Sequence, residues 1–202
     1  MLDGYFRTVK DALLLPLARR LTAIPPVVIS LVGLICGLAA AVLLTQQQYG
    51  WGLAGWLLNR LFDGLDGAVA RTHRRQSNLG GYLDILFDFV AYAAIPLALA
   101  VGLPSQMNFL AAAFLLATFY LNAASWMYLA AVLEKQRRGA RDTGELTTIT
   151  MPDGLVGGAE TIFFYCMFII WPAQMALLFA LMGILVIITV VQRVIWALRF
   201  LD

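Results

Sequence analysis

Charged residues are scarce in this sequence. Only 13% of its 202 residues are Asp, Glu, Lys or Arg, whereas 61% are hydrophobic, and the mean hydropathy is +0.82. A soluble domain of this length would not need so much apolar surface, so the composition predicts an all-α integral membrane protein surrounded by membrane lipids. The net charge of +2 is too small to indicate a nucleic-acid partner. We expect one membrane-embedded domain over residues 1–202.

Cysteine and histidine are nearly absent as well. The two cysteines, Cys36 and Cys166, lie in apolar segments, where packing is their expected role and no disulfide framework is implied. The single histidine, His73, stands in a basic segment and is expected to be solvated or to face phosphate. A metal site in this chain would therefore be built from oxygen ligands.

Long hydrophobic runs separated by short turns predict six transmembrane helices. About 20 apolar residues suffice to cross the hydrocarbon core of a bilayer. The predicted spans cover residues 26–45, 51–71, 80–101, 107–133, 153–171 and 173–199. Residues 4–22 mix apolar and basic side chains, which predicts an N-terminal amphipathic helix lying at the membrane surface.

Positive charge is missing from three of the expected turns, around Gln47, Pro104 and Pro172. The 14 Lys and Arg residues lie on the opposite side or, like Arg60, within a helix. Because loops rich in Lys and Arg stay in the cytoplasm, the pattern predicts that both termini are cytoplasmic. We expect the protein in a bacterial inner membrane.

Four aspartates stand out against this apolar background: Asp63, Asp66, Asp84 and Asp88. An ionisable residue at membrane depth is costly and is by default a candidate for a functional site. Helical spacing places the first two acids on one face of the second predicted span and the last two on one face of the third. If these faces meet, four carboxylates share one small volume and need cations between them. Oxygen-only ligands favour Mg²⁺ or Mn²⁺.

Two other interpretations of the acids are open. Arg60 or Arg71 could neutralise one or two of them in structural ion pairs, although two arginines cannot pair four carboxylates. A small membrane transporter or channel also uses intramembrane carboxylates. Against this second alternative, the acids cluster near one predicted membrane face and form no path across.

Eight residues around these acids fit one gapless pattern, D-x2-D-G-x2-A-R-x8-G-x3-D-x3-D. They are Asp63, Asp66, Gly67, Ala70, Arg71, Gly80, Asp84 and Asp88. This spacing resembles the signature of the CDP-alcohol phosphatidyltransferases. The first helix of that family often opens Pro-Asn-x-x-Thr-x-x-Gly, and Pro26, Ser30 and Gly33 fit this frame, with Val27 in place of the usual Asn.

The resemblance implies a reaction, a metal and a set of roles. The family transfers the phosphatidyl group of CDP-diacylglycerol to an alcohol acceptor and releases CMP, with two Mg²⁺ or Mn²⁺ ions and with homodimers as the expected assembly. By this resemblance Asp63, Asp66 and Asp84 are metal ligands. Asp88 lies near the metals and acts as the general base. Four further residues would shape the nucleotide site: Gly67, Ala70, Arg71 and Gly80.

The identity of the acceptor has weaker signals. The segment after Asp88, with Pro96 eight residues on, is similar to that of bacterial phosphatidylserine synthases and favours serine; inositol phosphate and glycerol 3-phosphate are alternatives. Glu160 could touch the acceptor or pair with an arginine. Five arginines could receive an anionic acceptor or be ordinary cytoplasmic-side charge: Arg74, Arg75, Arg137, Arg138 and Arg141.

Overall fold

The structure, a computed structural model, describes residues 14–136 and 154–201. Within these ranges every regular element is helical, which confirms the all-α prediction. Residues 14–20 are helical. The elements that follow are α2 (Pro26–Thr45), α3 (Tyr49–Thr72), α4 (Asn78–Gly102), α5 (Gln106–Lys135), α7 (Gly158–Ile170), the 3-10 turn η1 (Pro172–Gln174) and α8 (Met175–Phe200).

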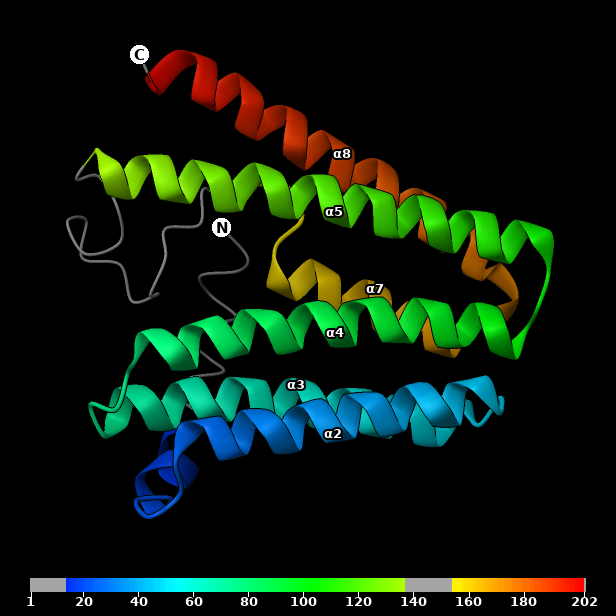
Figure 1. The fold of residues 1–202 in the computed structure, drawn as a ribbon. Helices are drawn as coiled ribbons and strands as arrows, with labels where there is room; N and C mark the ends of the chain where they lie inside the picture. The colour runs from blue at the N-terminus through cyan, green and yellow to red at the C-terminus, as the bar shows by residue number, and fades with distance from the viewer. Residues whose placement is uncertain (1–13, 137–153, 202) are drawn as a thin grey trace.

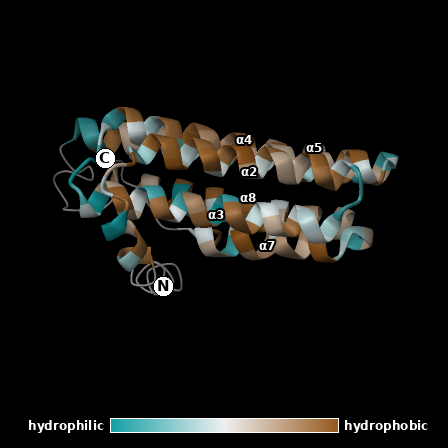
Figure 2. Ribbon diagram, turned by 90° about the horizontal axis from the view of Figure 1, so that it is seen from below, coloured by the Kyte–Doolittle hydropathy of each residue, from teal (hydrophilic) through white to brown (hydrophobic). Residues whose placement is uncertain are grey.

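The helices form two groups with α7 between them. α2 packs on α3 and α4, and α5 packs along α8, while the shorter α7 contacts α3, α4 and α8 (Figure 1). Hydrophobic residues cover the middle of the long helices, and hydrophilic residues collect mainly toward their ends (Figure 2). This distribution matches helices whose central parts lie in lipid.

Among the described residues, four helical segments are long and apolar enough to cross a membrane: Pro26–Thr45, Asn78–Gly102, Gln106–Lys135 and Pro172–Phe200. The chain is therefore an integral membrane protein, as predicted. α7 is shorter than the predicted fifth span because residues 154–157 are not helical. Its 13 residues rise only about 20 Å, against a hydrocarbon core of about 30 Å. The count of six spans stays a prediction.

Small residues let α2 and α3 approach closely. A Cβ atom added to Gly55 of α3 would lie 2.9 Å from the Cβ of Ala40, and one added to Gly33 of α2 would lie 3.1 Å from the Cβ of Phe62. In lipid, helices associate through such close backbone packing because there is little hydrophobic driving force between them. The contact fixes the rotation of α3, and with it the direction of its acidic face.

An aromatic cluster attaches α7 to the same group of helices. The rings of Trp56 on α3 and Tyr165 on α7 stack with their centroids 4.8 Å apart. The Tyr165 hydroxyl donates a 2.6 Å hydrogen bond to the backbone oxygen of Tyr92 on α4. Both Trp56 and Tyr165 are fully buried. This cluster joins α3, α4 and α7 next to the acidic faces of α3 and α4.

The helical residues 14–20 pack on the same group. Ala18 is buried against α2 and α3, and its backbone oxygen lies 2.9 Å from Nε2 of His73, at the end of α3. His73 thus has a structural contact with the N-terminal segment, where the sequence suggested solvent or phosphate. Residues 1–13 of the predicted surface helix lie outside the described residues, and its amphipathic character stays a prediction.

Candidate active site

A five-residue loop between α3 and α4 makes the two helices antiparallel. Arg74 turns the chain with a φ of 52°, in the left-handed region. The Ser77 hydroxyl then caps α4 by accepting a 3.0 Å hydrogen bond from the backbone N–H of Gly80. A Cβ on Gly80 would lie 3.1 Å from that hydroxyl, so a larger residue would crowd the cap. The reversal faces the acids of α4 toward those of α3.

The four aspartates of the motif line one pocket between α2, α3 and α4. The pocket holds about 220 Å³ of space, part of it open to solvent. Its lining consists of Ser30, Gly33, Leu34, Asn59, Arg60, Asp63, Asp66, Asp84, Phe87 and Asp88. The structure thus brings the two acidic faces together around a common volume.

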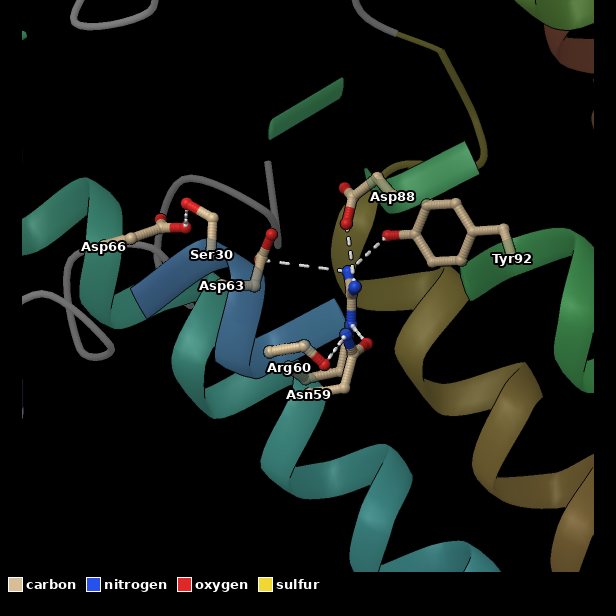
Figure 3. A network of polar contacts seen from close by, with 8 residues as sticks. Ser30, Asn59, Arg60, Asp63, Asp66, Asp88 and Tyr92 are labelled. Atoms are coloured by element: carbon tan, nitrogen blue, oxygen red, sulfur yellow. Dashed lines mark hydrogen bonds and ion pairs between the residues drawn. The ribbon is translucent and has the colours of Figure 1, made fainter. Parts of the chain in front are cut away.

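The side chain of Arg60 is at the centre of the polar network in this pocket (Figure 3). Its Nη2 donates a 2.7 Å hydrogen bond to Oδ1 of Asp88. Its Nη1 donates to the Tyr92 hydroxyl at 2.8 Å and lies 3.8 Å from Oδ2 of Asp63. Its Nε donates to Oδ1 of Asn59 at 2.9 Å. One guanidinium therefore connects acids from two helices, and the sequence-based suggestion that Arg60 pairs with some of the acids agrees with this geometry.

Two aromatic rings contact the guanidinium of Arg60, and its partner Asn59 is bound to the backbone of α2. The guanidinium carbon lies 4.8 Å from the ring centroid of Trp56 and 4.9 Å from that of Tyr92, within the range of cation–π contacts. Asn59, which accepts from Arg60, donates from Nδ2 to the backbone oxygen of Gly33 at 2.8 Å. The arginine is therefore anchored to α2, α3 and α4 at once.

The acids differ in their exposure. Asp66 is buried, and its Oδ2 accepts a hydrogen bond from the Ser30 hydroxyl of α2. The side chains of Asp63 and Asp88 are 23% and 30% exposed, and Asp84 is also partly exposed. The pocket thus has one acid at its buried side and three that solvent can reach.

The donor set fits a hard divalent cation in kind. It consists of four carboxylates and a hydroxyl, and oxygen ligands are those that Mg²⁺ and Mn²⁺ take. In the described ranges, however, no three Asp, Glu, His or Cys side chains lie close enough together to form a ready-made metal site. The guanidinium of Arg60 lies between Asp63 and Asp88 and separates them.

The residues expected to shape a nucleotide site lie beside the pocket and not in its lining. Gly67, Ala70 and Arg71 follow Asp66 on the last turns of α3, toward the loop that leads to α4. A Cβ on Gly67 would lie 3.1 Å from Nη1 of Arg71, so the arginine side chain passes over this glycine. The absence of a side chain at Gly67 thus leaves room for the guanidinium of Arg71.

The candidate acceptor residues are spread over the molecule. Arg74 and Arg75 are exposed in the loop after α3. Glu160 is not in the pocket lining; its Oε2 accepts a 3.0 Å hydrogen bond from the backbone N–H of Gly157 and caps α7. This contact gives the acid a local capping role, and its contact with an acceptor stays a prediction. Arg137, Arg138 and Arg141 lie outside the described residues.

Tyr92, Trp56 and Tyr165 are residues of the site to which the sequence gave no role. Tyr92 follows Asp84 and Asp88 at i, i+4 spacing, which places it on the acidic face from the sequence alone. Trp56 and Tyr165 offer no such signal because their contact joins helices more than 100 positions apart in the chain.

Comparison with known proteins identifies the class to which this pocket belongs. The family model described as CDP-alcohol phosphatidyltransferase matches residues 23–198. Inner membrane protein YnjF of Escherichia coli (strain K12) is 35% identical over 171 residues, which cover 85% of this chain and 82% of that protein. The chain therefore belongs to the CDP-alcohol phosphatidyltransferase family. It is a membrane-embedded phosphatidyltransferase of phospholipid biosynthesis, and the transporter alternative is set aside.

Solved structures share the fold. Phosphatidylinositol phosphate synthase (PgsA1) of Mycobacterium tuberculosis with CDP-DAG bound superposes with a TM-score of 0.68 at 22% identity, covering 90% of this chain and 91% of that one. The same protein in complex with manganese and citrate gives a TM-score of 0.68 at 22% identity, covering 90% and 87%. At this level of identity the likeness concerns the fold.

Proposed function

We propose that this enzyme transfers the phosphatidyl group of CDP-diacylglycerol to an alcohol and releases CMP, with the help of divalent cations. The observation that carries the proposal is the meeting of Asp63, Asp66, Asp84 and Asp88 in one pocket. Family membership supports the reaction. The structures of PgsA1 with CDP-DAG and with manganese support the substrate and the metal.

Asp63, Asp66 and Asp84 would hold the cations, Mg²⁺ or Mn²⁺ and two in number, with Asp88 beside them. Bound cations would neutralise the pyrophosphate and polarise its phosphoryl oxygens. The protein itself contributes mainly position, which is most of what phosphoryl transfer requires. Ser30 orients the carboxylate of the buried Asp66 by donating to its Oδ2.

Asp88 would act as the general base. Its Oδ1 accepts from Arg60, which leaves Oδ2 to take the proton of the acceptor hydroxyl. The acceptor oxygen then forms a bond to the phosphatidyl phosphorus, the bond from that phosphorus to the CMP oxygen breaks, and CMP leaves. A positioned base of this kind contributes about 10²–10⁴-fold to the rate.

The nucleotide would lie over the last turns of α3. Gly67 and Ala70 are small enough to let a base and ribose approach the helix, and Gly80, near the start of α4, is proposed to belong to the same site. Arg71, whose planar guanidinium suits phosphate oxygens, would bind the pyrophosphate or a neighbouring phosphate group.

We infer serine as the acceptor from the segment that follows Asp88. The second candidate is inositol phosphate, because the structural relative PgsA1 is a phosphatidylinositol phosphate synthase; glycerol 3-phosphate is the third. Arg74 and Arg75, and Arg137, Arg138 and Arg141 beyond them, are the cations proposed to receive the anionic part of the acceptor. Glu160, which caps α7, is a further residue proposed to touch the acceptor.

In the membrane, α3 and α7 would complete six spans. The acids of α3 are turned to the interior pocket and α7 packs on its neighbours, so both can lie at membrane depth although neither is apolar and long enough alone. The charge pattern supports a cytoplasmic location for the active site and both termini. YnjF, an inner membrane protein, supports a bacterial inner membrane. A homodimer is the proposed assembly.

One experiment tests the reaction and the acceptor together. Purified protein is incubated with labelled CDP-diacylglycerol, Mg²⁺ or Mn²⁺, and serine, inositol, inositol phosphate or glycerol 3-phosphate in separate reactions, and the lipid product is identified. We expect phosphatidylserine and CMP, and none in excess EDTA. A different lipid would replace serine as the acceptor, whereas no lipid with any alcohol, or full activity in EDTA, would overturn the proposed reaction or its metal dependence.

A further inference from the structure

Arg60 lies outside the eight-residue motif, yet its side chain occupies the middle of the pocket that the motif builds. It is three residues, about one helical turn, before Asp63. It is the one cation among the ten lining residues of the described chain. Only 6% of the residue is exposed. Removing a guanidinium from water is costly unless its partners replace the lost hydration, so a charge in this place needs an explanation beyond surface solubility.

The contacts of Arg60 fix its orientation as well as its charge. Nε, Nη1 and Nη2 each donate to a different residue, on α3 and α4. Trp56 and Tyr92 lie against the guanidinium within 5 Å. A planar, rigid fork with this many contacts has little freedom to rotate, unlike a lysine ammonium in the same place. The orientation of any group that depends on it is therefore fixed too.

Asp88 is the group that depends on it most. Its Oδ1 is held at 2.7 Å by Nη2 of Arg60, so the other oxygen is the one presented to the pocket. Asp63 lies farther away, at 3.8 Å from Nη1, and shares the same positive charge. The geometry has two consequences. Arg60 selects which oxygen of Asp88 can work, and its charge opposes any second cation that enters between Asp63 and Asp88.

We propose that Arg60 is a positioning residue that orients the Asp88 carboxylate for the transfer step and weakens the affinity of the acidic pocket for divalent cations. This rests on the proposed function for the role of Asp88. The proposal predicts that loss of the arginine slows transfer but raises the affinity for divalent cations. Loss of a residue with a purely structural role would not raise that affinity.

The test uses Arg60→Gln, Arg60→Lys and, as a matched control that removes one exposed positive charge elsewhere, Arg199→Gln on α8. Each purified full-length protein is titrated with Mn²⁺ alone, with free ion followed by electron paramagnetic resonance. The rate of CMP release is then measured against CDP-diacylglycerol and acceptor concentration. Thermal unfolding reports whether each variant is folded.

For Arg60→Gln we expect kcat to fall about 10²-fold, the loss typical of a misplaced reacting group. Its Mn²⁺ affinity should rise at least about threefold, because a unit charge close to the ligands is gone. Arg60→Lys keeps the positive charge but loses the planar set of N–H donors. Its Mn²⁺ affinity should therefore match that of the parent, while kcat should still fall at least about tenfold. Arg199→Gln should match the parent in both.

Parent-like kcat in Arg60→Gln, or an Mn²⁺ affinity in that variant that is unchanged or lower than in the parent, would overturn the proposal. If Arg60→Gln does not fold, Arg60→Lys decides alone, and parent-like kcat in that variant would overturn it as well. Failure of the proposed function looks different. In that case the parent itself releases no CMP or binds no Mn²⁺, whatever residue 60 is.

Discussion

The α2–α3–α4 group and the α5–α8 pair each contain a buried arginine, and the two arginines have different surroundings. Arg60 is 6% exposed and contacts Asp63 and Asp88 in the pocket. Arg193 on α8 is 8% exposed and donates from Nη1 to the side-chain oxygen of Asn122 on α5, outside the pocket lining. A buried charge alone does not mark an active site in a membrane protein. The site around Arg60 is marked by the pocket that acids of α3 and α4 line together with it.

The surroundings of the two arginines sharpen the contrast. Near Arg193, the Thr189 hydroxyl accepts from the backbone N–H of Val156 at 3.0 Å, and Oε1 of Gln192 accepts from that of Leu155 at 3.0 Å. These side chains of α8 hold the segment that leads into α7. These two side chains of α8 therefore fix the backbone before α7, whereas the polar side chains around Arg60 line a pocket that solvent can reach.

The largest effect should come from removing an acid of that pocket. Asp63→Asn takes away a negative charge and a proposed metal ligand at the same time. We expect CMP release to fall by more than about 10⁴-fold, beyond the contribution of a general base alone. The rate is measured with saturating Mg²⁺. Asp66→Asn should behave in the same way, and more than about 0.01% of parent activity in either variant would contradict the assignment of that acid.

The next largest effect separates the two acids of α4. Asp88→Asn should lower kcat by about 10²–10⁴-fold, because a positioned base is lost, and should keep Mn²⁺ binding. Asp84→Asn should lose Mn²⁺ binding as well, because a ligand is lost. Calorimetric titration of both variants with Mn²⁺ distinguishes the two roles. Equal loss of binding in both would make Asp88 chiefly a ligand.

Much of this region was accessible from the sequence. The bounds of α2 match the prediction, 26–45, because Pro25 precedes the helix, Pro26 suits its first position and the polar turn after Thr45 ends it. The helical spacing of the four aspartates was enough to place them on facing surfaces. Periodicity works here because a buried polar face is rare in a span that is otherwise apolar.

The parts that were missed depend on how helices rotate against one another. The start of α7 was placed too early, although Gly157 followed by Glu160 at the third helical position is a recognisable N-terminal signal. The sequence suggested that Arg60 pairs with acids but not which ones. That choice depends on the close packing of α2 on α3 and on the ring contact between Trp56 and Tyr165, and neither can be read from spacing along one helix.

A smaller effect is expected on the α5–α8 side. Arg193→Met should lower the free energy of unfolding by about 1–3 kcal/mol, because the half-buried side chain of Asn122 loses its hydrogen-bond donor. Its Mn²⁺ affinity should equal that of the parent. Thermal unfolding in detergent and the Mn²⁺ titration check the two halves. A rise in Mn²⁺ affinity like that expected for Arg60→Gln would mean that the two regions act as one electrostatic unit.

The smallest effect tests how finely Arg60 is held. Tyr92→Phe removes the hydroxyl that accepts from Nη1 at 2.8 Å and keeps the ring that lies 4.9 Å from the guanidinium. One net hydrogen bond is worth about 1 kcal/mol, so kcat should fall less than about tenfold, with Mn²⁺ affinity unchanged because no charge is altered. The matched control is Tyr128→Phe, which removes an exposed hydroxyl on α5 and should have no effect. If Tyr92→Phe slowed transfer as much as Arg60→Gln, the tyrosine hydroxyl itself would be the group that orients the reaction, with the arginine as its support.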